Sequence, residues 1–327
     1  MVTDQLRALV RRYPIVRFAT QRLRTRLPRR LGGLDPDRLP PWMRRFPLEL
    51  PRTEQGPASG PDRVELELPG DLTVPRRLEE GGLAQYGPAG LSCFLAAVEH
   101  AEPGAVFDVG SGVGVYAALA AARSRRAVFA FEPAPELAAA ARTVSDSGDL
   151  GVTVVGTAVG NYNGTARLRR SPYNDTCNTT VSGGTALTDL AHSQVPIVSL
   201  SRWAEEAAAH PRVVTVDTAG SEPDVVAGAL EVLRRHRPWI LVKVRPDLGL
   251  EERLMALLEP LGYWWYPVHE EVPSSPRGRI DARESPSWER MWLLAPHEAP
   301  PEYWGSVLAW RSALARCLPA MRSGSEN

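Results

Sequence analysis

The sequence predicts an α/β fold built on a doubly wound, mostly parallel sheet of about seven strands, with a helical or irregular arm at its N-terminus. Two observations lead to this prediction. From about residue 64, short apolar segments with strand character alternate with helical segments, which is typical of parallel strands joined by right-handed crossovers. Before residue 64 arginine, proline and glycine are frequent, and the pattern of a sheet is missing.

Length and composition set the broad class of protein. The chain has 327 residues, of which 43% are hydrophobic, so it can bury one large core. Its formal net charge is zero, but residues 1–31 hold nine arginines against one acid, which leaves about −8 for the remainder. We therefore expect no nucleic-acid partner. No segment is apolar enough over its length to span a membrane, and the three cysteines have no CxxC spacing, so we expect a cytoplasmic protein.

The first 63 residues are predicted to be a basic arm followed by a linker. Apolar side chains recur at helical spacing over residues 3–27, and arginines occupy the other faces. We expect this arm to pack on the domain or on a second subunit, which would give a homo-oligomer. Binding to a membrane surface and an organellar transit peptide are the alternatives. The predicted boundaries are 1–63 for the arm and linker, 64–300 for the α/β domain and 301–327 for a C-terminal helix and tail.

The elements of the α/β domain follow one another in a regular order. Polar loops are expected at 171–194 and 269–289, and the aromatic run 263–266 is expected to alternate between core and surface on an edge strand. Strands are predicted at 64–68, 105–110, 127–133, 152–160, 164–170, 195–200, 212–217, 239–244, 263–268 and 290–295, and helices at 90–100, 114–124, 134–148, 221–236, 251–262 and 301–321.

The segment "VFDVGSGVGVY" carries the clearest functional signal. Asp108 ends a strand, and Gly110, Gly112 and Gly114 form a G-x-G-x-G turn before a helix. Glycine suits such a turn because the backbone bends sharply and a ligand must approach it without a Cβ in the way. The free N–H groups at the start of the following helix favour an anionic group of that ligand.

A second signal is Glu132, which ends the next strand in "FEP". An acid at this distance after the first glycine accepts hydrogen bonds from a ribose diol, and both dinucleotide and S-adenosylmethionine (SAM) sites use that arrangement. The G-x-G-x-G spacing favours SAM. So does Asp108, whose carboxylate could meet the ammonium group of a methionine moiety. A nicotinamide dinucleotide site remains the alternative, and with it an NAD-dependent oxidoreductase.

Together with later motifs, these segments resemble the FkbM-type SAM-dependent methyltransferases. The resemblance runs from about Ala105 to Pro246 and includes "VFAFEPAPELAAAA", "VGTAVGNYNGTARL", "VPIVSLSRWAEE" and a D-x-x-G-x-E segment, here Asp217, Gly220 and Glu222. It implies a Rossmann-like class I methyltransferase fold, SAM as methyl donor, and a hydroxyl acceptor on a sugar, polyketide or similar small-molecule natural product. Transfer to nitrogen or carbon, and a non-catalytic binding protein that retains the fold, stay open.

The candidate site residues follow from these motifs. Asp217 is the first candidate for a general base, and Glu222 has either a catalytic or a helix-stabilising role. His192, or alternatively His269, could also act as a base from a loop. A divalent metal bound by the carboxylates is possible, but no residue pattern indicates one. The cofactor-binding candidates are Tyr86, Asp108, Gly110, Ser111, Gly112, Gly114, Tyr116, Glu132, Pro133 and Ala158.

Lys243 is the only lysine of the chain, and it lies in the apolar segment "WILVKV". The resemblance implies an acid at this position and a lysine at the position of Thr215. Because neighbouring parallel strands lie about 4.8 Å apart, a lysine lost from one strand and gained on the next can serve the same site. We therefore predict that Lys243 pairs with Asp217 or Glu222. Attraction of an anionic acceptor is the alternative role.

Overall fold

The computed structural model describes residues 43–54, 60–70, 72–169, 179–181, 192–246, 249–284 and 290–319. The predicted arm over residues 1–31, with its proposed part in an oligomer, lies outside this range. So does Cys177, whereas Cys93 and Cys317 are buried and form no disulfide bond among the described residues.

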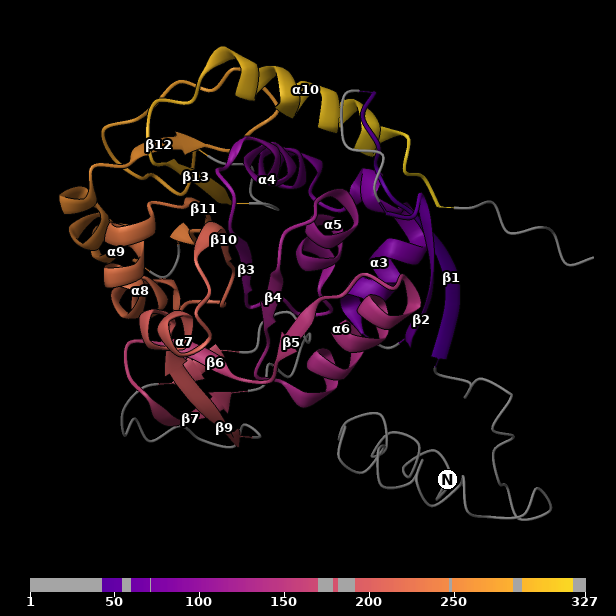
Figure 1. Ribbon diagram of the computed structural model, residues 1–327, viewed down its shortest axis with the longest axis horizontal. Helices are drawn as coiled ribbons and strands as arrows, with labels where there is room; N and C mark the ends of the chain where they lie inside the picture. Colours follow the sequence, from indigo (N-terminus) through magenta and orange to yellow (C-terminus); the bar gives the residue numbers. More distant parts are fainter. Residues whose placement is uncertain are drawn as a thin grey trace, which may run out of the picture.

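A seven-stranded sheet forms the centre of the molecule, as predicted. Its order is β12-β13-β11-β10-β3-β4-β5, and in Figure 1 these strands follow one another from β12 at the upper left to β5 near the centre. The five strands from β11 to β5 are parallel, and β13 runs antiparallel to both β11 and β12. The strands are β3 Ala105–Val109, β4 Val128–Phe131, β5 Thr153–Val155, β10 Pro211–Val216, β11 Trp239–Lys243, β12 Trp264–Pro267 and β13 Met291–Ala295.

Helices cover both faces of this sheet, which confirms the doubly wound α/β class. One face carries α4 (Pro88–His100), α5 (Val115–Arg123) and α6 (Pro135–Ser147), and the other carries α7 (Leu200–Glu206), α8 (Glu222–His236) and α9 (Glu251–Leu258), as Figure 1 shows. A short 3-10 helix, Glu259–Leu261, follows α9. Two apolar clusters fill the layers between sheet and helices, each built from the strand residues that point to its side.

A smaller four-stranded sheet stands beside the main one, with the order β6-β9-β7-β8. It corrects two expectations. The segment 152–160 is not one strand, because the chain leaves the main sheet after β5 and enters the second sheet as β6. The predicted loop 171–194 contains β8 and the start of β9. The strands are β6 Ala158–Gly160, β7 Gly164–Arg169, β8 Thr179–Val181 and β9 His192–Ser199, and β7 pairs antiparallel with β8 and β9, as expected for an added strand.

The N-terminal part of the described chain folds onto the domain. Residues expected in the linker form β1 (Met43–Glu49), which pairs antiparallel with β2 (Arg63–Pro69), so the predicted boundary at residue 63 divides a hairpin. The reason is local: "RRFPLEL" alternates polar and apolar residues, and Phe46 and Leu48 are buried in the core. The helix α3 (Thr73–Gly81) and the 3-10 turn η2 (Leu83–Gln85) then lead to α4.

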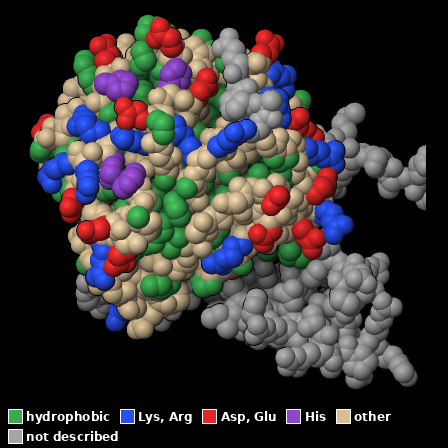
Figure 2. Space-filling model, viewed as in Figure 1, with side chains coloured by type: hydrophobic (Ala, Val, Ile, Leu, Met, Phe, Trp, Pro, Cys, Tyr) green, Lys and Arg blue, Asp and Glu red, His purple; other side chains and the backbone are tan. Residues whose placement is uncertain are grey.

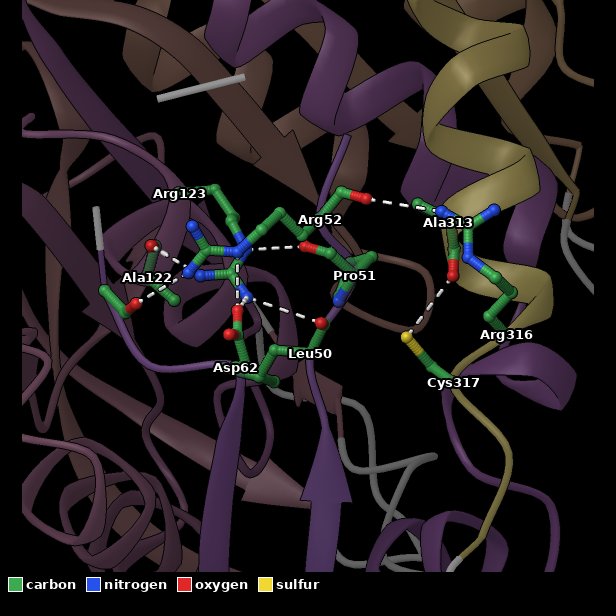
Figure 3. Close-up of polar contacts among 10 residues, drawn as sticks. Leu50, Pro51, Arg52, Asp62, Ala122, Arg123, Ala313, Arg316 and Cys317 are labelled. Atoms are coloured by element: carbon green, nitrogen blue, oxygen red, sulfur yellow. Dashed lines mark hydrogen bonds and ion pairs between the residues drawn. The ribbon is translucent and has the colours of Figure 1, made fainter. Parts of the chain in front are cut away.

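The last helix, α10 (Pro301–Ala315), packs along α4, and it ends near the hairpin. Figure 3 shows how Arg123 of α5 connects these parts: its guanidinium donates to the carbonyl oxygens of Pro51 (2.5 Å) and Leu50 (3.3 Å). Arg316, just after α10, donates to the carbonyl of Arg52. The hairpin and the C-terminal helix are therefore fixed to the same part of the domain.

The aromatic run before and within β12 differs from its expected alternation. Trp264 is 39% exposed, whereas Tyr263, Trp265 and Tyr266 are all buried, because α10 and the 269–284 segment cover the edge strand. Surface charge shows no single-sign patch on the face in Figure 2, where acidic and basic side chains are interspersed. Within the described ranges, no helix is both long and apolar enough to cross a membrane.

Candidate active site

The glycine-rich turn connects β3 to α5 at the carboxyl edge of the main sheet. Gly110 and Gly112 have φ angles of 79° and 57°, in the left-handed region that favours glycine. A Cβ on Gly110 would lie 2.1 Å from the backbone oxygen of Asp217, so this glycine permits the close approach of β3 and the segment after β10. A Cβ on Gly112 would meet nothing within 4 Å, because this residue faces open space.

That open space is a cleft at the carboxyl ends of β3, β4 and β10, where ligands bind in open α/β sheets. It encloses about 100 Å³, less than the roughly 300–1,000 Å³ of typical ligand pockets. A nucleoside-sized ligand would therefore extend beyond the enclosed part or displace part of the wall. The lining residues are Val74, Tyr86, Val109, Gly110, Ser111, Gly112, Val113, Phe131, Glu132, Pro133, Leu137, Thr157, Ala158, Val159, Leu168, Thr180, Asp217 and Thr218.

Glu132 follows β4 and forms one side of the cleft. Its carboxylate accepts hydrogen bonds from the backbone N–H groups of Gly112 (2.9 Å) and Ala134 (2.8 Å), the residue that caps α6. Burial raises the pKa of Glu132 from its ordinary value of 4.5 to about 8, although both hydrogen bonds act in the opposite direction. An acid that is buried and fixed in this way has a defined orientation toward the glycine turn.

Asp108 lies behind the glycine turn and does not line the cleft. One carboxylate oxygen accepts the hydroxyl of Thr215, which is its register partner on β10, and the other accepts the N–H of Ala117 in α5 (3.1 Å). Burial raises its pKa to about 6. The Asp108 carboxylate is therefore not placed to make the contact with a methionine ammonium group that the sequence predicted. Its two oxygens instead hold β10 and α5 against β3.

Asp217 and Lys243 confirm the predicted pairing. The Nζ of Lys243 lies 2.8 Å from an Oδ of Asp217. β10 and β11 are parallel neighbours in which Val216 pairs with Val242, so the next residue of each segment lies side by side with the other. The Asp217 side chain is 40% exposed and lines the cleft, whereas Lys243 is 23% exposed and does not. The lysine therefore holds the carboxylate from the side away from the cleft.

Glu222 has a different position from Asp217. It is fully buried, and its carboxylate accepts the N–H groups of Thr218 (3.0 Å) and Gly220 (3.0 and 3.1 Å). Its burial raises its pKa, and it is absent from the cleft wall. Of the two roles that the sequence left open, this geometry favours the structural one, in which Glu222 fixes the turn between Asp217 and α8.

The segment that holds this site matches a protein-family model. Residues 108–263 match the model described as the methyltransferase FkbM domain. This segment is an FkbM methyltransferase domain. The match contains the glycine turn, Glu132, Asp217 and Lys243, and it confirms the family predicted from the motifs. The search of curated proteins gives no match.

Solved structures give weaker likenesses. The methyltransferase FkbM of Methylobacillus flagellatus aligns with 14% identity and a TM-score of 0.39, over 59% of this chain and 43% of that chain. The match thus spans less than half of that protein's length. The precorrin-6y C5,15-methyltransferase of Geobacter metallireducens gives 11% identity and a TM-score of 0.36, over 63% of this chain and 87% of that chain. Scores this low bear on neither activity nor substrate.

The remaining candidates in and around the FkbM domain divide between the cleft and the core. Tyr86 and Pro133 lie on the cleft wall with Ala158, the first residue of β6. Tyr116 does not, because its ring packs edge-on against Phe94, with centroids 5.0 Å apart. Gly114 caps α5 with a φ of 81° and also lies outside the wall.

No histidine lines the cleft among the side chains that the structure describes. His192 is the first residue of β9 and not part of a loop, and its side chain lies outside the described set. His269 is held near α10, where Arg311 binds its carbonyl oxygen. In the described part of the chain, no cluster of three or more His, Cys, Asp or Glu side chains could hold a metal ion.

Several wall residues were missed by the sequence reasoning. Thr157 and Thr218 stand next to the predicted residues Ala158 and Asp217, so their places after strand ends were a usable signal. Val74, Leu168 and Thr180 come from α3, β7 and β8, and no pattern in those segments marks them. Their position depends on how the second sheet and the N-terminal helix pack over the cleft.

Proposed function

We propose that this protein is a SAM-dependent methyltransferase that methylates a hydroxyl group of a small-molecule, sugar or natural-product acceptor. The FkbM domain supports methyl transfer. The cleft supports the cofactor: Gly112 leaves open space where a Cβ would stand, and Glu132 is fixed beside it. In addition, the buried hydroxyl oxygens of Ser111 and Thr218 on the cleft wall have no hydrogen-bond partner among the described residues.

Each part of the cleft suits one part of SAM. Glu132 would accept the ribose hydroxyls, and the apolar side chains of Pro133 and Leu137 would flank the adenine. The glycine turn would receive the methionine end. When bound, SAM supplies an electrophilic methyl group on a sulfonium ion, and the task of the chain is to align the acceptor oxygen with that methyl group.

Asp217 is the single observation that favours an alcohol as acceptor. An alcohol must lose a proton as its oxygen forms the new bond to carbon, and a base in the cleft can take that proton. Asp217 is a partly exposed carboxylate on the cleft wall, and Lys243 fixes its direction. The other three acids of this region, Asp108, Glu132 and Glu222, are buried and accept hydrogen bonds from the protein with both carboxylate oxygens.

The cellular setting that we propose is the cytoplasm. Cys93 and Cys317 are buried and form no disulfide bond among the described residues, which suits a compartment where thiols stay reduced. Burial also raises the pKa of Cys317 to about 11, so this thiol is unreactive at neutral pH.

A calorimetric titration tests the cofactor. We expect SAM and S-adenosylhomocysteine to bind the wild-type protein and NAD not to bind. Gly110→Ala should abolish binding, because the new Cβ would lie 2.1 Å from the backbone oxygen of Asp217. Gly305→Ala is the matched control: its Cβ would meet nothing within 4 Å, so the affinity should stay the same. Binding of NAD but not SAM would support an oxidoreductase instead.

Transfer of a labelled methyl group to a panel of hydroxyl-bearing metabolites tests the reaction. With an acceptor in hand, Asp217→Asn should lower turnover by about 10²- to 10⁴-fold, because the base is lost, and should leave SAM affinity nearly unchanged. Asp224→Asn is the control, since Asp224 pairs with Arg253 outside the cleft. Full turnover by Asp217→Asn would argue against this base.

A further inference from the structure

We infer that the hydroxyl groups of Thr218 and Ser111 bind the amino-acid end of SAM, the role that the sequence suggested for Asp108. This inference rests on the proposed function. Both hydroxyl oxygens are buried, and neither has a hydrogen-bond partner among the described residues. Both residues line the same cleft. Burying a hydroxyl without a partner is unfavourable, so two such groups on one wall indicate a ligand that would bond to them.

The two residues meet across the glycine turn. Ser111 is held in this turn by its N–H, which donates to the carbonyl of Phe131 (3.1 Å). Thr218 follows Asp217, whose N–H donates to the carbonyl of Val109 (3.0 Å). A Cβ on Gly110 would lie 3.2 Å from Cγ2 of Thr218, so the threonine packs directly over this glycine. The two residues thus flank Gly110, one from the end of β3 and one from the segment after β10.

The backbone around Thr218 is fixed before any ligand arrives. The buried carboxylate of Glu222 accepts the N–H groups of Thr218 and Gly220. Between them Ala219 has a φ of 55°, a left-handed conformation that is unfavourable for a residue with a Cβ. Strained turns persist where the surroundings enforce them and are common at ligand sites. Glu222 is therefore a positioning residue that presents the Thr218 side chain to the cleft.

The chemistry of the hydroxyls matches the amino-acid end of the ligand. A hydroxyl can accept a hydrogen bond from an ammonium group and donate one to a carboxylate, so one pair can serve both groups. Asp108 does not line the cleft, and its two oxygens accept hydrogen bonds from Thr215 and Ala117, so it is not placed to meet the ammonium group. The cleft wall has two acids: Asp217 precedes Thr218 and pairs with Lys243, and Glu132 follows β4, on the other side of β3 from Thr218.

The strand order supports this assignment. β10, β3 and β4 are consecutive neighbours, so Thr218 and Glu132 follow strands two places apart, or roughly 10 Å. A ligand that places a ribose diol at Glu132 must reach this far to meet Thr218. SAM in an extended conformation has its amino-acid end on the far side of the sulfur from the ribose. Its adenosine part alone does not reach.

Two probes separate the ends of the ligand. S-adenosylhomocysteine carries the amino-acid end, whereas 5′-methylthioadenosine keeps the adenosine and the sulfur and lacks that end. Thr218→Val preserves the shape of the side chain and removes its hydroxyl. Measured by calorimetry, it should weaken S-adenosylhomocysteine about tenfold, as expected for one lost bond to a charged group, and change 5′-methylthioadenosine by less than about twofold. Ser111→Ala should behave in the same way.

Two further variants make the test specific. Thr218→Ser keeps the hydroxyl and should bind S-adenosylhomocysteine nearly as well as the wild type. Thr143→Val makes the same change on the exposed surface of α6 and should alter neither affinity. The inference would be overturned if Thr218→Val weakened the binding of both probes equally or weakened neither. In that case SAM binding by the wild type would still support the proposed function. A wild-type protein that binds neither probe would overturn both.

Discussion

The two edges of the main sheet carry opposite kinds of side chain. At the carboxyl edge, Asp108, Glu132 and Glu222 each accept backbone N–H groups in the glycine turn or near the first turn of a helix. At the amino edge, Arg126 donates to the carbonyls of Val98, Ala101, Glu102 and Gly104 near the end of α4. Arg212 does the same for the carbonyl of His236, the last residue of α8.

This difference follows from the direction of the helices. In a parallel α/β sheet the helices run opposite to the strands, so they begin at the carboxyl edge with free N–H groups and end at the amino edge with free carbonyls. Acids satisfy the first set and arginines the second. Two histidines follow the same division, since His100 and His236 end α4 and α8.

Cavity size does not distinguish the functional edge. The amino edge has a cavity of about 750 Å³, much larger than the cleft of about 100 Å³ at the carboxyl edge. Two of the arginines that line the larger cavity, Arg123 and Arg126, bind carbonyl oxygens of the protein itself. The cleft, in contrast, has the unpartnered hydroxyls and the exposed carboxylate of Asp217. Unused polar groups are therefore a better guide to a ligand than volume is.

The comparison predicts that changes at the amino edge affect stability and leave cofactor binding intact. Arg123→Met would leave the carbonyls of Leu50 and Pro51 without their donor, and the free energy of unfolding should fall by about 2–4 kcal/mol. Urea denaturation measures this. Arg45→Met, on an exposed pair with Glu67, should cost less than about 1 kcal/mol. If Arg123→Met lost SAM affinity while its free energy of unfolding stayed unchanged, the two edges would not differ in this way.

At the carboxyl edge we expect a stability that depends on pH through Glu132. Its pKa is about 8 in the folded protein, against an ordinary value of 4.5. Between these values the folded protein keeps a proton that the unfolded chain loses, so the stability contributed by this group falls as pH rises and is constant above pH 8. Glu132→Gln cannot titrate. Its Tm relative to wild type should therefore rise by at least about 2 °C from pH 5 to pH 8, and a constant difference would contradict the prediction.

The smallest effect is expected for the ion pair beside the cleft. Lys243→Met should lower the free energy of unfolding by less than about 1 kcal/mol, because Asp217 is 40% exposed and water screens the pair. Turnover should fall by up to about tenfold, because the Asp217 carboxylate loses its fixed direction. High salt screens the ion pair, so it should lower the turnover of the wild type toward that of the variant. Unchanged stability and turnover would mean that Lys243 has no role at this site.

Much of the fold could be predicted because it depends on short segments. The seven strands of the main sheet and five of its six flanking helices follow from apolar runs of strand or helix length, whereas the short helix α7 was not predicted. The misses have physical causes. The strand at 43–49 was hidden in a proline- and arginine-rich region, where the alternation of Phe46, Leu48 and Leu50 was too short to identify. The split of 152–160 depends on a second sheet that forms only when distant strands pair.

The residues of the site could be predicted where they belong to short motifs. The sequence by itself determined the glycine turn, Glu132, Asp217 and the FkbM family, because each depends on residue types a few positions apart. The tertiary structure alone decided which of these groups face the cleft. The Asp108 carboxylate accepts the hydroxyl of Thr215, 107 residues away, and is kept from the cleft. The Asp217 carboxylate pairs with Lys243 on the next strand. Both outcomes are set by the register of β3, β10 and β11, which no local pattern of residues encodes.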